Sequence, residues 1–335
     1  MRDDRLLRIL FNCAASMMLL ISAGCGSQNG YPADVMQDAP ATLQTATRII
    51  SIRPVTNTPT AQAKLSATLP LTATPYPCGS EICIFPGHFV FDVPIGAGNN
   101  QVVEPSYPYG GTLNGNREPH HGVEFINPSG TPILAAGNGM VVYAGNDVNT
   151  LFGQMLFYYG NLVIIEHKVE GFNTPIYTLY GHLSKIQTST GAQVQRGDVI
   201  GEVGRTGKAM GSHLHFEIRE GINDFVHTRN PELWLDPGEG KGILVGQIFN
   251  KANEVRRYPD ISILPADDPD AKPVNPIPYA GSSTNGDSLY KEVFASGPLL
   301  AGKYVLTFAP YSKIQTIKFE IHPGAVTRIT LQTDY

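Results

Sequence analysis

Two histidines separated by one residue are the clearest chemical feature of this sequence. His213 and His215 lie in the run Gly-Ser-His-Leu-His-Phe-Glu-Ile-Arg, residues 211–219, in which apolar and polar residues alternate. This alternation is typical of a β-strand, and alternate residues of a strand share a face, so both rings point the same way, roughly 6–7 Å apart. One ring can hold a metal ion while the other acts on what the metal binds. A lone His-x-His also occurs as two unrelated histidines on a half-exposed strand.

Further candidate residues lie upstream. His120 and Glu124 are four residues apart, and His182 follows a glycine. A catalytic zinc site typically takes three His or carboxylate ligands and leaves one position open for water. On a straight strand residues 120 and 124 would be roughly 13 Å apart, too far for two ligands of one ion. Gly122 is placed to allow the necessary bend, and His121 is expected to point elsewhere.

The elements that must position these residues are short strands separated by glycine turns. Strand-like runs occur at 139–144, 161–166, 176–180 and 198–203. No long segment shows a 3.6-residue period, so the sequence predicts an all-β fold of antiparallel character. His167, at the end of the second run, is expected to be a structural histidine bonded to the backbone.

The three histidine motifs, in this order, resemble those of the LytM/lysostaphin-type zinc metallopeptidases, peptidase family M23. The segments 130–136, 139–145 and 201–207 resemble the framework of that family, and the resemblance extends over roughly residues 86–237. It implies an antiparallel β-sheet domain with one Zn²⁺ ion in a groove across the sheet.

The resemblance also implies roles for the candidate residues. His120, Glu124 and His215 would hold the zinc ion, and His182 and His213 would be catalytic histidines that do not bind it. The family usually has Asp where this chain has Glu124, a side chain of the same charge and one methylene longer. No His-Glu-x-x-His motif supplies a glutamate base, so an imidazole takes that part near neutral pH. We expect His213 to be the general base and His182 to stabilise the oxyanion, roles that could be exchanged.

The function expected from these features is that of an exported zinc endopeptidase that cuts the peptide cross-links of bacterial peptidoglycan. The alternative is a non-hydrolytic LytM-type module that binds cell wall or activates a partner hydrolase, but the presence of all four histidines favours the enzyme. A zinc-stabilised structural domain fits poorly, because three ligands leave a position open. A formal net charge of −5 gives no basic surface for nucleic acid. The sequence does not indicate the oligomeric state.

The amino terminus predicts export to the cell envelope. Arg2, Arg5 and Arg8 precede a short apolar run that ends in Ser-Ala-Gly before Cys25, the pattern of a secretory signal over residues 1–25. The run is short for a membrane span. Small residues before Cys25 resemble a bacterial lipobox, which implies a membrane-anchored lipoprotein. Plain secretion and an uncleaved anchor are the alternatives.

A linker and a cysteine pair precede the folded region. Residues 26–77 are rich in Thr, Pro and Ala and predict a flexible linker. In an exported chain, Cys78 and Cys83 predict a disulfide. A two-cysteine zinc site is the less favoured alternative, because no third and fourth ligand lie nearby. We assign residues 78–237 to the metallopeptidase domain.

Residues 238–335 predict a second β-domain. Its strand-like runs are 243–249, 261–264, 290–294, 304–308, 317–321 and 326–331, a spacing that suggests a small β-sandwich. Two of its segments resemble the transthyretin-like, carboxypeptidase-regulatory-type modules, which usually bind or brace rather than catalyse. The stretch 265–288 is predicted to be an extended loop.

Overall fold

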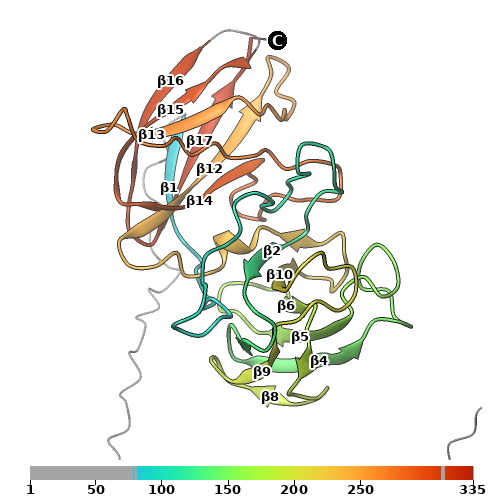
Figure 1. Ribbon diagram of the computed structural model, residues 1–335. Helices are drawn as coiled ribbons and strands as arrows, with labels where there is room; N and C mark the ends of the chain where they lie inside the picture. Colours follow the sequence, from blue (N-terminus) through green and yellow to red (C-terminus); the bar gives the residue numbers. More distant parts are fainter. Residues whose placement is uncertain (1–77, 79–80, 311–313, 335) are drawn as a thin grey trace, which may run out of the picture. The chain divides into compact units, whose positions relative to one another are not determined.

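The protein is described by a computed structural model that covers residues 78, 81–310 and 314–334. Strands form nearly all of the regular structure in this part of the chain (Figure 1), which confirms the predicted all-β fold class. A short 3-10 helix spans Pro231–Leu233. Among the described residues no helix has the length and apolar character needed to cross a membrane. The predicted signal segment 1–25 and linker 26–77 lie outside the described residues.

A seven-stranded sheet carries most of the candidate residues. Its strand order is β11-β10-β6-β5-β4-β8, with β2 also paired to β10, and every pairing is antiparallel. A smaller antiparallel sheet has the order β3-β9-β7. The four runs predicted as strands coincide with β4, β5, β6 and β9. The bounds are β2 Val123–Ile126, β3 Pro132–Leu134, β4 Gly139–Asn146, β5 Asn161–His167, β6 Ile176–Gly181, β7 Lys185–Ile186, β8 Gln193–Val194, β9 Val199–Glu202, β10 His213–Glu220 and β11 Thr228–Arg229.

The side-chain pattern of β5 and β10 explains their places in the sheet. In β5, Val163 and Ile165 enter one apolar cluster and Leu162 and Ile164 enter another, so the strand is covered on both faces. This is why it has a continuous apolar run. In β10 only the alternate residues beginning at Leu214 enter the core. The other face of β10 is therefore left to polar side chains.

Strands from the C-terminal part of the chain form two further sheets. Their orders are β1-β17-β12-β14 and β13-β15-β16, and apolar side chains from both sheets form one shared core. The predicted β-sandwich and the resemblance to transthyretin-like modules stay predictions. The bounds are β1 Ile82–Pro86, β12 Lys241–Phe249, β13 Ile261–Pro265, β14 Phe294–Leu300, β15 Gly302–Phe308, β16 Gln315–Ile321 and β17 Ala325–Gln332.

The strand predicted at 290–294 was wrong in position. β14 begins only at Phe294 and continues through Gly297 and Pro298 to Leu300. β14 is an edge strand of its sheet, and an edge strand tolerates a proline because one side needs no backbone donor.

The cysteine pair and β1 lie at the start of the folded region. The predicted disulfide joins Cys78 and Cys83. β1 then pairs with β17 over five residues, so residues 82–86 contribute to a C-terminal sheet although the sequence grouped them with residues 78–237. The proposed boundary between residues 237 and 238 stays a prediction.

Candidate metal centre

Glu124 and His215 are brought face to face by strand pairing. In the antiparallel register of β2 and β10, Glu124 is opposite His215. Directly opposite residues project to the same face of a sheet, here the polar face of β10. At the predicted bend, a Cβ on Gly122 would lie 2.4 Å from the carbonyl oxygen of Phe216 and 2.9 Å from the His215 ring. Only glycine lets the chain turn into β2 this close to β10.

His120 completes a group of three potential metal ligands. One ligand atom from each of His120, Glu124 and His215 lies within 4.8 Å of the other two. Nε2 of His120 is 3.2 Å from Nδ1 of His215 and 3.9 Å from Oε1 of Glu124, so the longer glutamate still reaches the group. Two imidazole nitrogens and one carboxylate oxygen that converge in this way form a donor set that suits zinc.

The outer nitrogen of each of these rings is fixed by a hydrogen bond. Nδ1 of His120 donates to the carbonyl oxygen of Tyr107 at 2.7 Å, and the His120 ring stacks on that tyrosine. Nε2 of His215 donates to Oε1 of Glu217 at 3.0 Å. Burial, and next the neighbouring His215, lower the pKa of His120 well below its usual value. The inner nitrogens therefore present two lone pairs to each other, an arrangement that a bound cation stabilises.

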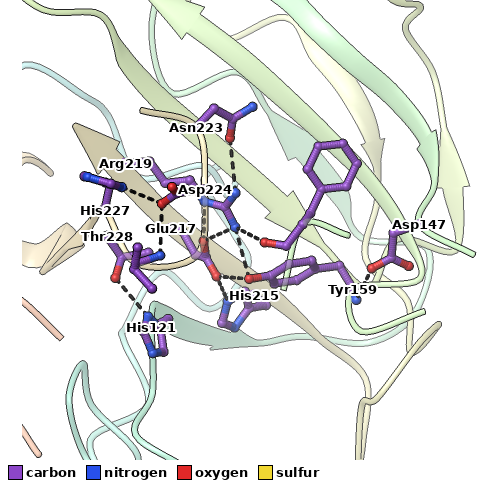
Figure 2. Close-up of polar contacts among 12 residues, drawn as sticks. His121, Asp147, Tyr159, His215, Glu217, Arg219, Asn223, Asp224, His227 and Thr228 are labelled. Carbon is purple, nitrogen blue, oxygen red and sulfur yellow. Dashed lines mark hydrogen bonds and ion pairs between the residues drawn. The ribbon is translucent and has the colours of Figure 1, made fainter. Parts of the chain in front are cut away.

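Glu217 belongs to a buried polar network behind His215 (Figure 2). Its carboxylate also accepts hydrogen bonds from the Tyr159 hydroxyl at 2.5 Å and from Nε of Arg219 at 2.8 Å. Burial alone would raise the pKa of Glu217, but Arg219 and the hydrogen bonds hold it at about 2. Arg219 in turn donates to Asn223 at 3.1 Å. Glu217 is thus an ionised acceptor that keeps the Nε2 proton of His215.

Glu217 and Arg219 were not among the residues predicted from the sequence. The available signal was the two-residue period of β10, which places both on the same face as His215. The motif alone gave no sign that Tyr159, in a loop before β5, supplies a further donor to Glu217.

His182 and His213 lie beside the ligand group with their ring centroids 4.8 Å apart. Nδ1 of His182 donates to the carbonyl oxygen of Thr206 at 2.8 Å, and Nδ1 of His213 to that of Gly211 at 3.0 Å. In the neutral ring, each Nε2 therefore keeps its lone pair. Nε2 of His213 is 3.6 Å from Oε1 of Glu124, too long for a hydrogen bond.

Both of these rings are neutral at pH 7. Burial, with the two neighbouring histidines, lowers the pKa of His182 to about 3. Burial also lowers the pKa of His213, against the opposing charge of Glu124. His182 has a φ of 67°, a left-handed conformation that costs energy for a residue other than glycine and is found most often at functional sites.

The structure brings all five predicted residues to one place, while their individual roles stay predictions. His121 and His167 do not join them. His121 bonds through Nδ1 to the hydroxyl of Thr228 at 3.0 Å and through Nε2 to that of Ser283 at 3.1 Å. His167 bonds to the carbonyl oxygen of Asn138 at 2.8 Å.

A groove of about 800 Å³ passes over the ligand group. Tyr107 and Tyr158 line it, with Arg117 5.0 Å from the centre of the first ring and Lys208 5.9 Å from the centre of the second. Aromatic rings with a few placed charges are typical of sites that bind organic ligands. The groove is large enough for a segment of peptide lying across the ligand group.

Known proteins match part of the chain. The family described as peptidase family M23 matches residues 118–227, which include all five candidate residues. Peptidoglycan DD-endopeptidase ShyA of Vibrio cholerae is 40% identical over 100 residues, covering 30% of this chain and 20% of that protein. Cell division protein DipM of Caulobacter vibrioides is 36% identical over 125 residues, covering 37% and 18%. The chain therefore spans about a fifth of the length of these relatives.

Among solved structures, the chain is similar to the catalytic domain of the antimicrobial peptidase lysostaphin from Staphylococcus simulans. The sequence identity is 30%, the match covers 37% of this chain and 86% of that one, and the TM-score is 0.32.

Proposed function

Because residues 118–227 match peptidase family M23, we propose that the protein is a zinc-dependent endopeptidase that hydrolyses peptide cross-links of bacterial peptidoglycan. The observation that carries this proposal is the convergence of His120, Glu124 and His215 beside a groove. The relative ShyA is named for endopeptidase action on peptidoglycan, which supports the choice of substrate.

In this proposal His120, Glu124 and His215 hold one zinc ion. A zinc ion in such a set supplies Lewis-acid chemistry, which polarises the scissile carbonyl and makes water a nucleophile near neutral pH. The protein's own contribution is geometric: Tyr107 and Glu217 keep the outer nitrogens protonated. The inner lone pairs therefore need no deprotonation before the ion binds.

His213 is the proposed general base. Its free Nε2 lies 3.6 Å from Oε1 of Glu124, next to the place where water would meet the ligand group. The neutral ring accepts a proton there and can then give it to the leaving amine.

His182 is proposed to stabilise the oxyanion. Its Nδ1 proton is used by the carbonyl oxygen of Thr206, so it can donate only when Nε2 is also protonated. Negative charge that develops on the substrate raises the pKa of His182 and so favours uptake of a proton from solvent at Nε2. The same geometry allows the roles of His182 and His213 to be exchanged.

We also propose that the protein acts outside the cytoplasm, at the cell envelope. The export pattern of the amino terminus and the Cys78–Cys83 disulfide support this, because disulfides persist in oxidising compartments. In this proposal Cys25 carries a lipid anchor, residues 78–237 are the peptidase domain and residues 238–335 the second domain.

The test is incubation of the zinc-loaded full chain with isolated peptidoglycan, followed by mass spectrometry of the released peptides. His213→Ala is the matched control, and its zinc content is measured in parallel. We expect new amino termini from the native chain and none from the variant, with zinc retained by both. Loss of zinc from His213→Ala would instead identify His213 as a ligand.

A second outcome separates the enzyme from its alternative. If the native chain binds one zinc ion and releases no peptide, the proposed hydrolysis is wrong. The non-hydrolytic module that binds cell wall or activates a partner hydrolase would then be the better reading.

A further inference from the structure

His120 lies in a loop without strand or helix, residues 107–121. Two backbone hydrogen bonds close this loop, from Gly110 to His120 at 2.7 Å and from His120 to Gly111 at 3.0 Å. The same loop supplies the Tyr107 carbonyl that fixes the His120 ring. The position of this potential ligand therefore depends on where the whole loop lies.

A segment far along the chain, residues 279–287, packs against this loop. The N–H of Ala280 donates to the carbonyl oxygen of Gly110 at 2.9 Å. A Cβ on Gly110 would lie 2.6 Å from Cα of Tyr279, so the two backbones are in direct contact. The rings of Tyr279 and Tyr109 meet edge to face with centroids 4.9 Å apart.

The 279–287 segment also touches both chain neighbours of His120. Gly281 has a φ of 75°, and a Cβ there would lie 3.0 Å from Cγ of Pro119. On the other side, the hydroxyl of Ser283 bonds to Nε2 of His121 at 3.1 Å. His120 is thus held between two contacted residues.

The segment is itself fixed to the C-terminal sheet. The N–H of Tyr279 donates to the carbonyl oxygen of Val293 at 2.8 Å, and the N–H of Val293 donates to that of Gly246 in β12 at 2.7 Å. At its other end, the carboxylate of the buried Asp287 lies 3.1 Å from Nε2 of the buried His88. A segment anchored at both ends can resist displacement of the loop that it covers.

We propose that the 279–287 segment is a positioning element of the metal centre, which holds the loop so that His120 faces Glu124 and His215. This proposal rests on the proposed zinc site. It assigns a part in that site to residues outside the region matched by the M23 family. No atom of the segment is one of the three potential ligands, so its effect passes through its contacts with the loop, which include those to Gly110, Pro119 and His121.

The test compares alanine substitutions at two glycines that both have a left-handed backbone conformation. Gly281→Ala introduces a Cβ against Pro119, whereas Gly324→Ala introduces one where nothing lies within 4 Å, and both glycines have a positive φ. Zinc affinity of the full chain is measured by competition with a chromophoric chelator, at a temperature where thermal unfolding shows each variant to be folded. We expect Gly281→Ala to lower the affinity by about tenfold, as for residues that orient ligands, and Gly324→Ala to change it by less than about twofold.

Two further variants separate positioning from general stability. Ser283→Ala removes the bond to His121 without adding bulk, and we expect an affinity loss of about threefold. Pro119→Ala removes the Cγ that an alanine at position 281 would meet, so it should restore most of the affinity in the Gly281→Ala background.

The outcomes distinguish this inference from the proposed function. If Gly281→Ala and Ser283→Ala bind zinc as tightly as Gly324→Ala and lose only thermal stability, the segment stabilises the fold by packing but does not position His120. The inference is then wrong. If the native chain binds no zinc, the proposed site fails, and the inference fails with it.

Discussion

At the scale of single residues, His215 can turn only one nitrogen toward a metal ion, and Glu217 determines which one. The carboxylate is ionised and buried, and it accepts the Nε2 proton of His215 at 3.0 Å. Arg219 lies on its other side at 2.8 Å. An unpaired buried charge is costly, so these three side chains hold one another in place.

Glu217→Gln tests this dependence. The amide has nearly the same shape, but it lacks the charge that retains the proton on Nε2, and it leaves the Arg219 guanidinium without its counter-ion. We expect zinc affinity to fall by about 10–100-fold and the zinc-free chain to lose about 3–5 kcal/mol of unfolding free energy. Chelator competition and urea unfolding measure the two effects.

The matched control is Glu220→Gln on the same strand. Glu220 pairs with Arg229 at 2.8 Å, and both side chains keep some exposure. We expect little change in zinc affinity and a stability loss of no more than about 1 kcal/mol. Equal zinc affinity in Glu217→Gln and Glu220→Gln would contradict the role given to Glu217.

The sequence indicated the five candidate residues because residue type and spacing are local properties. It did not indicate the partners that fix their protons. The carbonyl oxygens of Tyr107 and Thr206 that bond to His120 and His182 are backbone atoms, and any residue could supply them. Such partners become identifiable only once the chain is folded.

At the scale of elements, β10 separates the core from the metal centre. One face of the strand carries Leu214, Phe216 and Ile218 into the core, and the other carries His213 and His215. Because the side-chain period of a strand is two, a shift of one residue against β2 would exchange these faces. The close approach of Gly122 to β10 therefore helps to set which residues enter the core and which reach the candidate metal centre.

Gly122→Ala tests that approach. The added Cβ would meet the carbonyl oxygen of Phe216 and the ring of His215, so β2 and β10 must separate. We expect a stability loss of about 1–3 kcal/mol, typical of overpacking, together with a loss of zinc affinity of about tenfold or more. Thermal unfolding and chelator competition measure these changes.

Gly96→Ala is the control for that substitution. A Cβ there would make an ordinary contact of 3.7 Å with a methyl group of Leu134. The stability and the zinc affinity should therefore stay close to those of the native chain. Native zinc affinity in Gly122→Ala would show that the bend does not set the position of Glu124.

His167, the last residue of β5, bonds to the carbonyl oxygen of Asn138, and its lowered pKa predicts a pH dependence of stability. Burial lowers its pKa to about 4, against about 6.5 in the unfolded chain. Above pH 6.5 the ring is neutral in both states. As the pH falls from 6.5 toward 4, only the unfolded state takes up the proton, so stability is lost at roughly 1.4 kcal/mol per pH unit.

Comparison with His167→Gln isolates the contribution of His167, because the contributions of the other titrating groups to the pH dependence of stability are the same in both chains and cancel in the difference. Urea unfolding of both zinc-free chains between pH 7 and 4.5 should show the native chain losing stability relative to the variant below pH 6.5. A difference that does not change with pH would contradict the lowered pKa.

The sequence predicted elements well where one strand's own pattern decides its place. The continuous apolar run of β5 and the alternation of β10 are examples. It misplaced β14, which contains Gly297 and Pro298, residues that are uncommon inside a strand but that an edge strand tolerates. It also could not place β1, whose partner β17 begins more than 200 residues later.

At the scale of the whole molecule, one apolar core extends past the predicted domain boundary. The cluster that contains Trp234 also contains Ile243, Val245, Tyr290 and Val326. His88 connects two of these residues, since its ring lies 4.3 Å from that of Trp234 and 5.0 Å from that of Tyr290. Residues after the predicted boundary at 237 therefore cover apolar side chains that precede it.

A chain that ends at residue 237 should not fold as the full chain does. Without the later strands, Trp234 and its neighbours would be exposed, and β1 would lose β17. We expect such a chain to bind a hydrophobic dye and to unfold without a cooperative transition, while the chain through residue 335 unfolds cooperatively. A truncated chain with a cooperative transition and native zinc affinity would contradict both this expectation and the positioning role of the 279–287 segment.

The packing of residues 279–287 against the loop 107–121 had no local signal in the sequence. The stretch 265–288 was predicted as an extended loop, and nothing in its composition points to a contact with residues 107–121. The contact depends on two glycines, Gly110 and Gly281, that let distant backbones approach.

The place of β1 has a mechanical consequence. It is an edge strand paired antiparallel with β17, and it is the first strand after Cys78. Tension applied to the chain ahead of Cys78 enters the described structure at Cys78, which a disulfide joins to Cys83 in β1. It therefore acts on β1 and on the pairing of β1 with β17. The C-terminal sheet thus receives the force before the strands that carry Glu124 and His215, so a pull on this part of the chain would strain β1 before it strained the candidate metal centre.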